Sequence, residues 1–95
     1  MTEATLQRRI QRAIRDAGGK CYKLHGSPYS VAGMPDLIGS VNGRAFTLEV
    51  KLPGNTATAK QEYELEQWRA QGWVAAVVTS VEEAEKLLDI ADAKE

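Results

Sequence analysis

Three ionisable side chains can meet on one face of a short hairpin. Asp36 precedes a run of strand-forming residues, and Glu49 and Lys51 end a second run. The dipeptide Asn42-Gly43 between the runs predicts a two-residue type I′ turn, because both residues tolerate positive φ angles. With that turn, Asp36 faces Glu49 across the ribbon, with Cβ atoms roughly 4.5–5.5 Å apart. Lys51 shares their face, since side chains alternate along a strand.

Two carboxylates placed directly opposite each other repel, and a divalent cation between them reverses the sign of that interaction. Hard cations such as Mg²⁺ bind carboxylate oxygens and keep several waters, so the hairpin indicates a metal site with a lysine beside it. The alternative is a solvated strand face with scattered charges. Two features favour the metal site. Pro35 fixes the backbone just before Asp36, and Leu37, Leu48 and Val50 form an apolar opposite face that sets the register.

The elements that must position this hairpin follow the order αβββαβα, an α/β fold with one mixed β-sheet flanked by helices. Thr2 is a candidate N-cap for a helix over 3–17, and a short strand is expected over 20–25. After the hairpin, Thr58 is the candidate N-cap of a helix over 59–71. The continuous apolar run 73–79 is typical of a strand buried on both faces. Strand, helix and strand here predict a right-handed parallel crossover.

Two of the expected helices have further sequence signals. In the helix over 59–71, Leu65 and Trp68 form the apolar stripe, with Tyr63 and Ala59 as additional members. The residues 80–83 form a capping box, which predicts that the last helix begins there. Its inward-facing side chains are then expected to be Val81, Ala84, Leu87, Leu88 and Ala91.

Length and composition indicate one small folded domain over residues 1–95. Hydrophobic residues make up 43% of the chain and charged residues 26%, as in soluble globular proteins. Cys21 is the single cysteine, so an intrachain disulfide and a cysteine zinc cluster are excluded, and we expect it to be a small buried residue. Because no secretion signal or 18-residue apolar run occurs, we expect a cytoplasmic protein with no membrane partner.

Charge is distributed unevenly along the chain, although the net charge is only −1. Residues 1–60 carry nine Lys and Arg against four Asp and Glu, whereas residues 61–95 carry three against nine. The part that holds the hairpin is therefore basic, which favours a polyanionic partner. Ordinary helix-surface charge is the alternative for many of these residues. The side chains that we expect to contact DNA are Arg8, Arg12, Lys23, His25, Ser27, Tyr29, Ser30 and Lys60.

The order of these motifs resembles the PD-(D/E)XK nuclease superfamily, and more closely its VRR-Nuc family. The resemblance rests on an early helical Glu3, the run Gly33-Met34-Pro35-Asp36-Leu37, the run Glu49-Val50-Lys51, and Gln61 at the next helix. It covers nearly the whole chain, and no part of the motif is missing. It implies a restriction-endonuclease-like fold and a metal-dependent DNA endonuclease, as in stand-alone members from phages and bacteria. Those members tend to be homodimers, and some act on branched DNA.

The resemblance also implies a role for each motif residue. Asp36, Glu49 and the Val50 carbonyl would bind Mg²⁺ or Mn²⁺, and Glu3 would complete the site directly or through water. Lys51 would orient or deprotonate the attacking water and stabilise the transition state. Gln61 would position Lys51, a water or a phosphate. The location would then be the cytoplasm of a bacterium or of a phage-infected host cell.

Two other functions are compatible with the sequence. A catalytically inactive DNA-binding module would keep the basic surface, but all the motif carboxylates are present, which disfavours it. A metal phosphohydrolase acting on a small molecule is disfavoured because the chain has no glycine-rich phosphate-binding loop. We also expect a homodimer, since a small core gains stability from association. Trp68, Trp73 and Tyr63 are either part of the dimer surface or, more commonly for such residues, part of the core.

Overall fold

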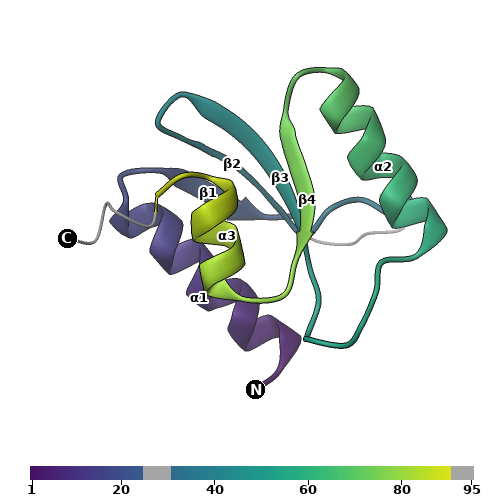
Figure 1. Ribbon diagram of the computed structural model, residues 1–95, viewed down its shortest axis with the longest axis horizontal. Helices are drawn as coiled ribbons and strands as arrows, with labels where there is room; N and C mark the ends of the chain where they lie inside the picture. Colours follow the sequence, from purple (N-terminus) through teal and green to yellow (C-terminus); the bar gives the residue numbers. More distant parts are fainter. Residues whose placement is uncertain (25–30, 91–95) are drawn as a thin grey trace.

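The computed structural model describes residues 1–24 and 31–90, and its elements follow the predicted order αβββαβα (Figure 1). A four-stranded mixed sheet has the order β1-β2-β3-β4. Its first three strands are antiparallel neighbours, and β4 is parallel to β3. The parallel pair confirms the predicted strand–helix–strand crossover. The elements are α1 (Glu3–Asp16), β1 (Lys20–Lys23), β2 (Leu37–Val41), β3 (Arg44–Val50), α2 (Ala59–Ala70), β4 (Val74–Val78) and α3 (Val81–Leu87).

The hairpin between β2 and β3 has the predicted register. Val41 pairs with Arg44, and Leu37 pairs with Leu48. Asn42 and Gly43 have φ angles of 52° and 77°, the left-handed values that a type I′ turn requires. Because the side-chain period of a strand is two, this register fixes which residues of both strands share a face.

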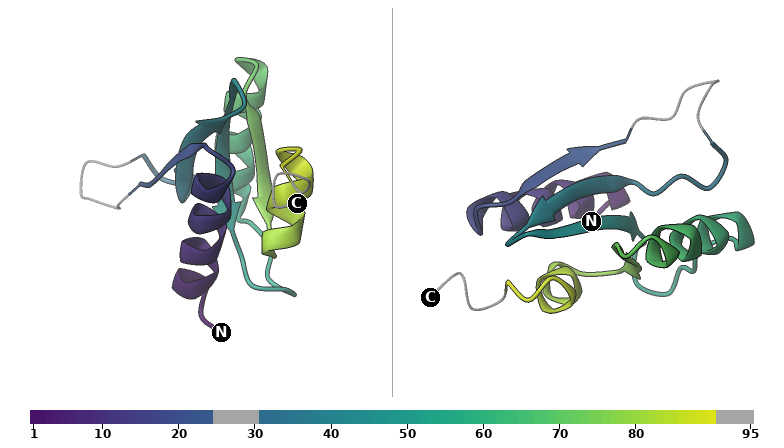
Figure 2. Two further views of the ribbon diagram at one scale, coloured as in Figure 1. Left: turned by 90° about the vertical axis from the view of Figure 1, so that its left-hand side faces the viewer. Right: turned by 90° about the horizontal axis from the view of Figure 1, so that it is seen from above.

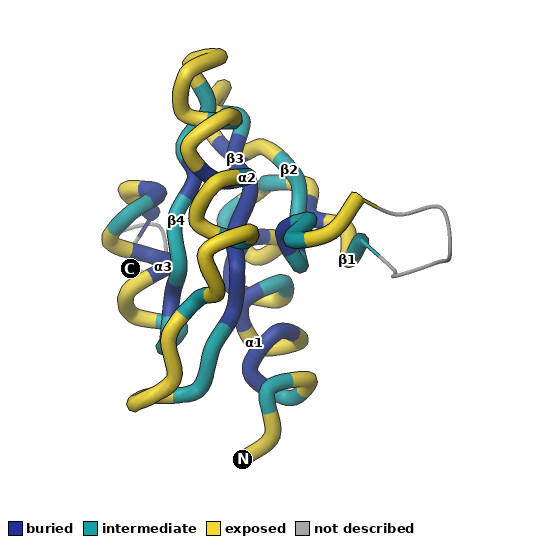
Figure 3. The backbone as a smooth tube through the Cα atoms, turned by 90° about the vertical axis from the view of Figure 1, so that its right-hand side faces the viewer, coloured by how far each residue is buried: buried dark blue, intermediate teal, exposed yellow. Residues whose placement is uncertain are grey.

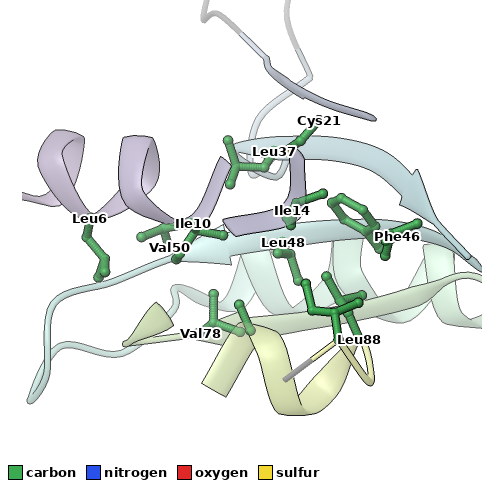
Figure 4. Close-up of a cluster of buried hydrophobic side chains, with 13 residues drawn as sticks. Leu6, Ile10, Ile14, Cys21, Leu37, Phe46, Leu48, Val50, Val78 and Leu88 are labelled. Atoms are coloured by element: carbon green, nitrogen blue, oxygen red, sulfur yellow. The ribbon is translucent and has the colours of Figure 1, made fainter. Parts of the chain in front are cut away.

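The main hydrophobic core lies between one face of the sheet and the helices α1 and α3. Figure 2 shows these two helices on one side of the sheet and α2 on the other. Side chains from every strand fill the space between the sheet and these two helices (Figure 4). Prominent members of this core are Ile10, Ile14, Phe46, Leu48, Val50 and Leu88. Cys21 is also buried there, as predicted, and burial raises the pKa of its thiol to about 11.

The helix α2 covers the opposite face over β3 and β4. Leu65 is fully buried below it, and the half-buried Trp68 packs edge-to-face on Trp73 with ring centroids 4.6 Å apart. The prediction that Tyr63 and Ala59 help the apolar stripe is wrong, because both are exposed. They lie on the sides of α2 that do not pack against the sheet. A helix on a narrow two-strand platform buries fewer positions than an amphipathic helix in a larger core.

Several boundaries differ from the predictions in small ways. The strand β1 ends at Lys23, although the Leu24 amide still donates to the Asp36 carbonyl at 2.8 Å. The strand β4 is only partly buried, because it lies at the edge of the sheet rather than inside it. The capping box of α3 is only half formed. Ser80 accepts from the Glu83 amide, but the Glu83 carboxylate accepts mainly from the amide and hydroxyl of Thr79, with only a weaker interaction with the Ser80 amide.

Among residues 1–24 and 31–90, no helix has both the length and the apolar character needed to cross a membrane. The predicted site residues His25, Ser27, Tyr29 and Ser30, and the predicted inward-facing Ala91, lie outside the described residues.

Candidate active site

The two carboxylates of the hairpin lie together where β2 begins and β3 ends. Glu49 is on β3 and only 2% exposed, on the sheet face that α2 covers. Asp36 lies one residue before β2 and is half-buried. Its Oδ2 accepts a hydrogen bond of 2.8 Å from the Val50 amide, which fixes the carboxylate against β3. Continuing the ladder beyond Leu37 and Leu48 places Asp36 opposite Glu49, as the turn chemistry predicted.

Lys51 follows β3 directly and lies two residues beyond Glu49, so the two side chains share a face. Its Nζ lies 3.6 Å from Glu49 Oε2, and its side chain is 16% exposed. The ammonium group therefore stands at the edge of the site, with one side against a buried carboxylate and a small part open to solvent. Such a cation can contact a substrate from a fixed position without being fully desolvated.

Gln61 joins the first turn of α2 to the same carboxylate. Its Nε2 donates to Glu49 Oε2 at 3.0 Å, and its Oε1 accepts from the Thr58 amide at 2.8 Å. The second bond belongs to a capping box in which the Thr58 hydroxyl accepts from the Gln61 amide. Because the capping bond requires an acceptor, it determines which end of the Gln61 side chain is directed at Glu49. The helix N-terminus thus orients the amide donor.

The electrostatic state of Glu49 is unusual for a glutamate. Its pKa is raised from 4.5 to about 8, mainly by burial and next by the nearby Asp36 carboxylate, while the Lys51 ammonium opposes both effects. Desolvation and a like charge both disfavour the ionised form. Two neighbouring carboxylates that are both ionised repel each other, and either of two arrangements relieves the repulsion. One carboxyl can keep a proton, or a cation can bind both groups.

The donor set fits a hard divalent cation. Glu49 Oε1 is buried and has no hydrogen-bond partner among the described residues. An unpartnered buried carboxylate oxygen is costly, and coordination of a cation would satisfy it. Asp36 would supply a second carboxylate, and oxygen ligands are those that Mg²⁺ and Mn²⁺ favour. Within residues 1–24 and 31–90, no group of three or more His, Cys, Asp or Glu is placed to hold a metal ion.

Glu3 is the first residue of α1, a helix that packs on the other face of the sheet. It is half-buried, and its charge makes a small contribution to the raised pKa of Glu49. The fold therefore brings the start of α1 within electrostatic range of the carboxylates. This relationship arises only from the packing of α1 across β3, and local sequence patterns do not contain it.

Of the residues predicted to contact DNA, those that the structure describes are all exposed. Arg8 and Arg12 lie on α1, Lys23 ends β1, and Lys60 lies in the first turn of α2. The two arginines belong to the helix on the sheet face opposite to Glu49, so they do not adjoin the carboxylates directly. Arg8 donates to the Thr5 hydroxyl at 3.2 Å. Their contact with DNA stays a prediction.

Gly33 was predicted only as part of a motif, but the structure gives it a packing role. Its φ angle is +84°, and a Cβ at this position would lie 2.6 Å from the Lys60 carbonyl oxygen and 2.9 Å from the Gln61 amide nitrogen. The segment before Asp36 therefore lies directly against the first turn of α2. A glycine two residues before Pro35 was the available signal, since glycine permits both positive φ and close backbone approach.

Comparison with known proteins bears on the fold of the chain. No protein-family model and no curated protein matches the chain. A solved structure described as "VRR_NUC domain" has a TM-score of 0.76 and 27% sequence identity, covering 94% of this chain and 96% of its own. A second, described as "VRR_NUC domain protein", has a TM-score of 0.69 at 18% identity, covering 99% of this chain and 86% of its own.

A third solved structure belongs to the same fold type. It is Hjc of Archaeoglobus fulgidus, a Holliday junction resolvase from an archaeal hyperthermophile, with a TM-score of 0.65 at 20% identity over 81% of this chain and 67% of its own. These likenesses confirm the predicted α/β architecture and the resemblance stated from the motifs. The chain therefore has the restriction-endonuclease-like, PD-(D/E)XK nuclease-type fold and resembles the VRR_NUC domain proteins over nearly its whole length.

Proposed function

We propose that this protein is a metal-dependent DNA endonuclease that hydrolyses phosphodiester bonds. The observation that carries the proposal is Glu49. It is a buried carboxylate with one unpartnered oxygen, Asp36 beside it, and the Lys51 ammonium 3.6 Å from its other oxygen. On a nuclease-type fold, this arrangement suits the binding of a divalent cation and a phosphate. A purely structural ion pair would not need the second carboxylate.

Asp36 and Glu49 would hold Mg²⁺ or Mn²⁺ with the Val50 carbonyl, and Glu3 would contribute through a water, since no third carboxylate among residues 1–24 and 31–90 is placed to bind directly. When bound, such a cation activates a water as the nucleophile and neutralises charge on the scissile phosphate. The Asp36 carboxylate is kept in place by the Val50 amide, and the Glu49 carboxylate by Gln61. Both groups are therefore fixed before a substrate arrives, which lowers the reorganisation needed during the reaction.

Lys51 supplies the positive charge that the reaction needs on the solvent side of the carboxylates. As phosphodiester hydrolysis proceeds, negative charge builds on the non-bridging phosphate oxygens. A fixed ammonium group stabilises that charge more strongly in a partly buried site than in water. Lys51 would also orient the attacking water or, in its neutral amine form, accept the proton of that water. Gln61 acts through Glu49, so it is a positioning residue.

We further propose that the substrate is branched DNA and that two copies of the chain act together in the cytoplasm. The likeness to a Holliday junction resolvase supports the first point. A dimer would place two sites on one branched molecule, so that both strands can be cut. Light scattering tests the dimer, because a mass near 10.4 kDa at working concentration would rule it out.

Cleavage of a DNA panel tests the function. Flap, splayed, nicked, four-way junction and linear duplex DNAs are incubated with purified protein in Mg²⁺, in Mn²⁺ and in EDTA. Cleavage with a divalent metal and none in EDTA is expected. Asp36→Asn is a suitable inactive control, because its side-chain oxygen can still accept from the Val50 amide. Tight junction binding without turnover in any metal would instead indicate an inactive DNA-binding module.

A further inference from the structure

One sheet face beside the carboxylates is open to solvent. The helix α2 packs on β3 and β4, and Figure 3, which looks onto this side, shows β1 and β2 next to α2 rather than below it. Side chains on this face of β1 and β2 are correspondingly accessible. Tyr22 is 61% exposed, Lys20 and Ser40 are also exposed, and Ile38 is half-buried.

This open face is continuous with the proposed active site. Tyr22 pairs with Ile38 across β1 and β2, and the bond from the Leu24 amide to the Asp36 carbonyl carries the ladder to the carboxylates. Ile38 and Asp36 are two residues apart and therefore share a face. Tyr22 and Asp36 are then diagonal neighbours, which lie roughly 7–8 Å apart in an antiparallel pair.

The charges around the site favour this face as the path of a polyanion. The strands β1 and β2 contain no acidic residue, and Lys20 lies on the same face as Tyr22. The helix α2 carries Glu62, Glu64 and Glu66 against Lys60 and Arg69, so its own net charge is negative. A strand of DNA that leaves Lys51 towards α2 meets like charge, whereas one that crosses β1 and β2 does not.

An exposed aromatic ring on an open basic sheet face suits contact with unpaired bases. Such rings stack on bases that have left a duplex, whereas bases inside a continuous duplex present no free ring face. Tyr22 is on a hydrogen-bonded strand, so its backbone position is fixed. Tyr63 is exposed to nearly the same extent, at 64%. However, it lies on α2, outside the strand ladder that joins Tyr22 to Asp36.

We propose that Tyr22 stacks on an unpaired base next to the scissile phosphate, and that Lys20 neutralises a phosphate of the same strand. This contact deepens the proposed nuclease function, on which it rests, by naming the substrate class: DNA with unpaired nucleotides at the cut site. The stacked base would hold the strand across β1 and β2, so that the adjoining phosphate lies at Asp36 and Glu49. Continuous duplex cannot make this contact without first unpairing a base.

Binding of fluorescent DNA without divalent metal tests the contact independently of cleavage. Splayed DNAs carry either normal bases or abasic residues at the unpaired positions, and a parallel set carries 2-aminopurine, whose emission falls on stacking. The proteins are wild type, Tyr22→Ala, Tyr22→Phe and the matched control Tyr63→Ala. Tyr22→Ala should weaken binding by about 5- to 150-fold, the range for loss of one base–aromatic stack. Tyr22→Phe and Tyr63→Ala should bind like wild type.

The abasic substitutions separate stacking from other effects of the mutation. Removing the base should weaken wild type and Tyr63→Ala, but should not weaken Tyr22→Ala further, because that variant has already lost the stack. Equal loss in all proteins, or unchanged 2-aminopurine emission on binding wild type, would overturn the contact. So would a change from dimer to monomer in Tyr22→Ala, because the face would then be an interface between copies.

The two proposals fail in different ways. If wild type cleaves DNA with metal but Tyr22→Ala binds and cleaves normally, the contact is wrong and the nuclease function stands. If wild type neither binds nor cleaves any DNA of the panel, the nuclease function itself is contradicted, and the contact falls with it.

Discussion

Gln61 holds Glu49 from the first turn of α2, with its Nε2 donating to Glu49 Oε2 at 3.0 Å while its Oε1 caps the helix at Thr58. One side chain thus serves two roles that are usually separate. The cap determines the orientation of the amide, and the amide leaves Glu49 Oε1 as the unpartnered oxygen. The start of α2 therefore decides which oxygen of the carboxylate is available to a cation.

Gln61→Glu should separate these roles. Glutamate at this position also completes a capping box, so α2 should keep its N-terminal cap. However, it places a carboxylate oxygen where Glu49 receives a donor. We expect kcat with Mg²⁺ to fall about tenfold or more, as when a positioned polar group is lost, with helix content by circular dichroism unchanged. Gln61→Ala loses both bonds and should also cost about 1 kcal/mol of unfolding free energy. Wild-type kcat in Gln61→Glu would refute the positioning role.

Replacing Lys51 by alanine should remove catalysis while leaving the fold intact. Its ammonium group lies against Glu49, and without it the Glu49 carboxyl still accepts from Gln61 and favours the neutral form more strongly, so no unpaired buried charge needs to remain. Losing a group that stabilises transition-state charge costs on the order of 10²-fold or more in kcat. Single-turnover cleavage measures the effect, and Lys86→Ala, an exposed lysine on α3, is the control. Equal rates in wild type and Lys51→Ala would rule out the proposed mechanism.

The sequence predicted the hairpin because its signals are local. The Asn42-Gly43 turn fixes the register, and the register places Asp36 opposite Glu49 with Lys51 on the same face. Likewise Thr58 and Gln61 contain the cap of α2. These relationships span few residues, so turn chemistry and strand periodicity are sufficient.

Contacts between segments that are far apart in the sequence could not be predicted from such local signals. The contact of Gly33 with the first turn of α2, and the open face around Tyr22, depend on where α2 packs on the sheet. The exposure of Tyr63 was missed for the same reason. Periodicity identifies the apolar positions of a helix but does not tell how wide a platform it covers. The placement of α1 on the face opposite Glu49 likewise appears only in three dimensions.

Stability of the metal-free protein should fall as pH rises. The pKa of Glu49 is raised from its ordinary 4.5 to about 8 by burial and by Asp36. The folded state therefore favours the neutral carboxyl. Its contribution is fully present below the unfolded pKa and is lost as pH rises through the folded pKa, here between about 4.5 and 8. The loss should reach a few kcal/mol, since one pKa unit corresponds to about 1.4 kcal/mol.

Urea unfolding in EDTA from pH 5 to 8.5 measures this dependence. Glu49→Gln is the control, because its amide stays neutral across the range. Subtracting the two curves removes the titration of other groups. A difference that stays flat over this range would show that Glu49 titrates normally in the folded protein.

Divalent metal should reverse the effect at neutral pH. A cation bound by Asp36 and Glu49 favours their ionised forms, so it stabilises the folded state and releases a proton. We expect Mn²⁺ and Mg²⁺ to raise the melting temperature of wild type at pH 7.5, by an amount that grows with metal concentration. Asp36→Asn and Glu49→Gln should show no such increase. An identical increase in all three proteins would place metal binding elsewhere.

Gly33→Ala should disturb the site through packing alone. The added Cβ would lie 2.6 Å from the Lys60 carbonyl oxygen, at a φ angle of +84°. Gly54→Ala is a matched control, with a φ angle of +92° and nothing within 4 Å of the added Cβ. Both variants strain the backbone by about 1–2 kcal/mol, but only Gly33→Ala displaces the turn that holds Gln61. We therefore expect both to lower the melting temperature, and Gly33→Ala alone to lower kcat. If Gly54→Ala lowers kcat equally, then loss of general stability, and not displacement of Gln61, accounts for the effect.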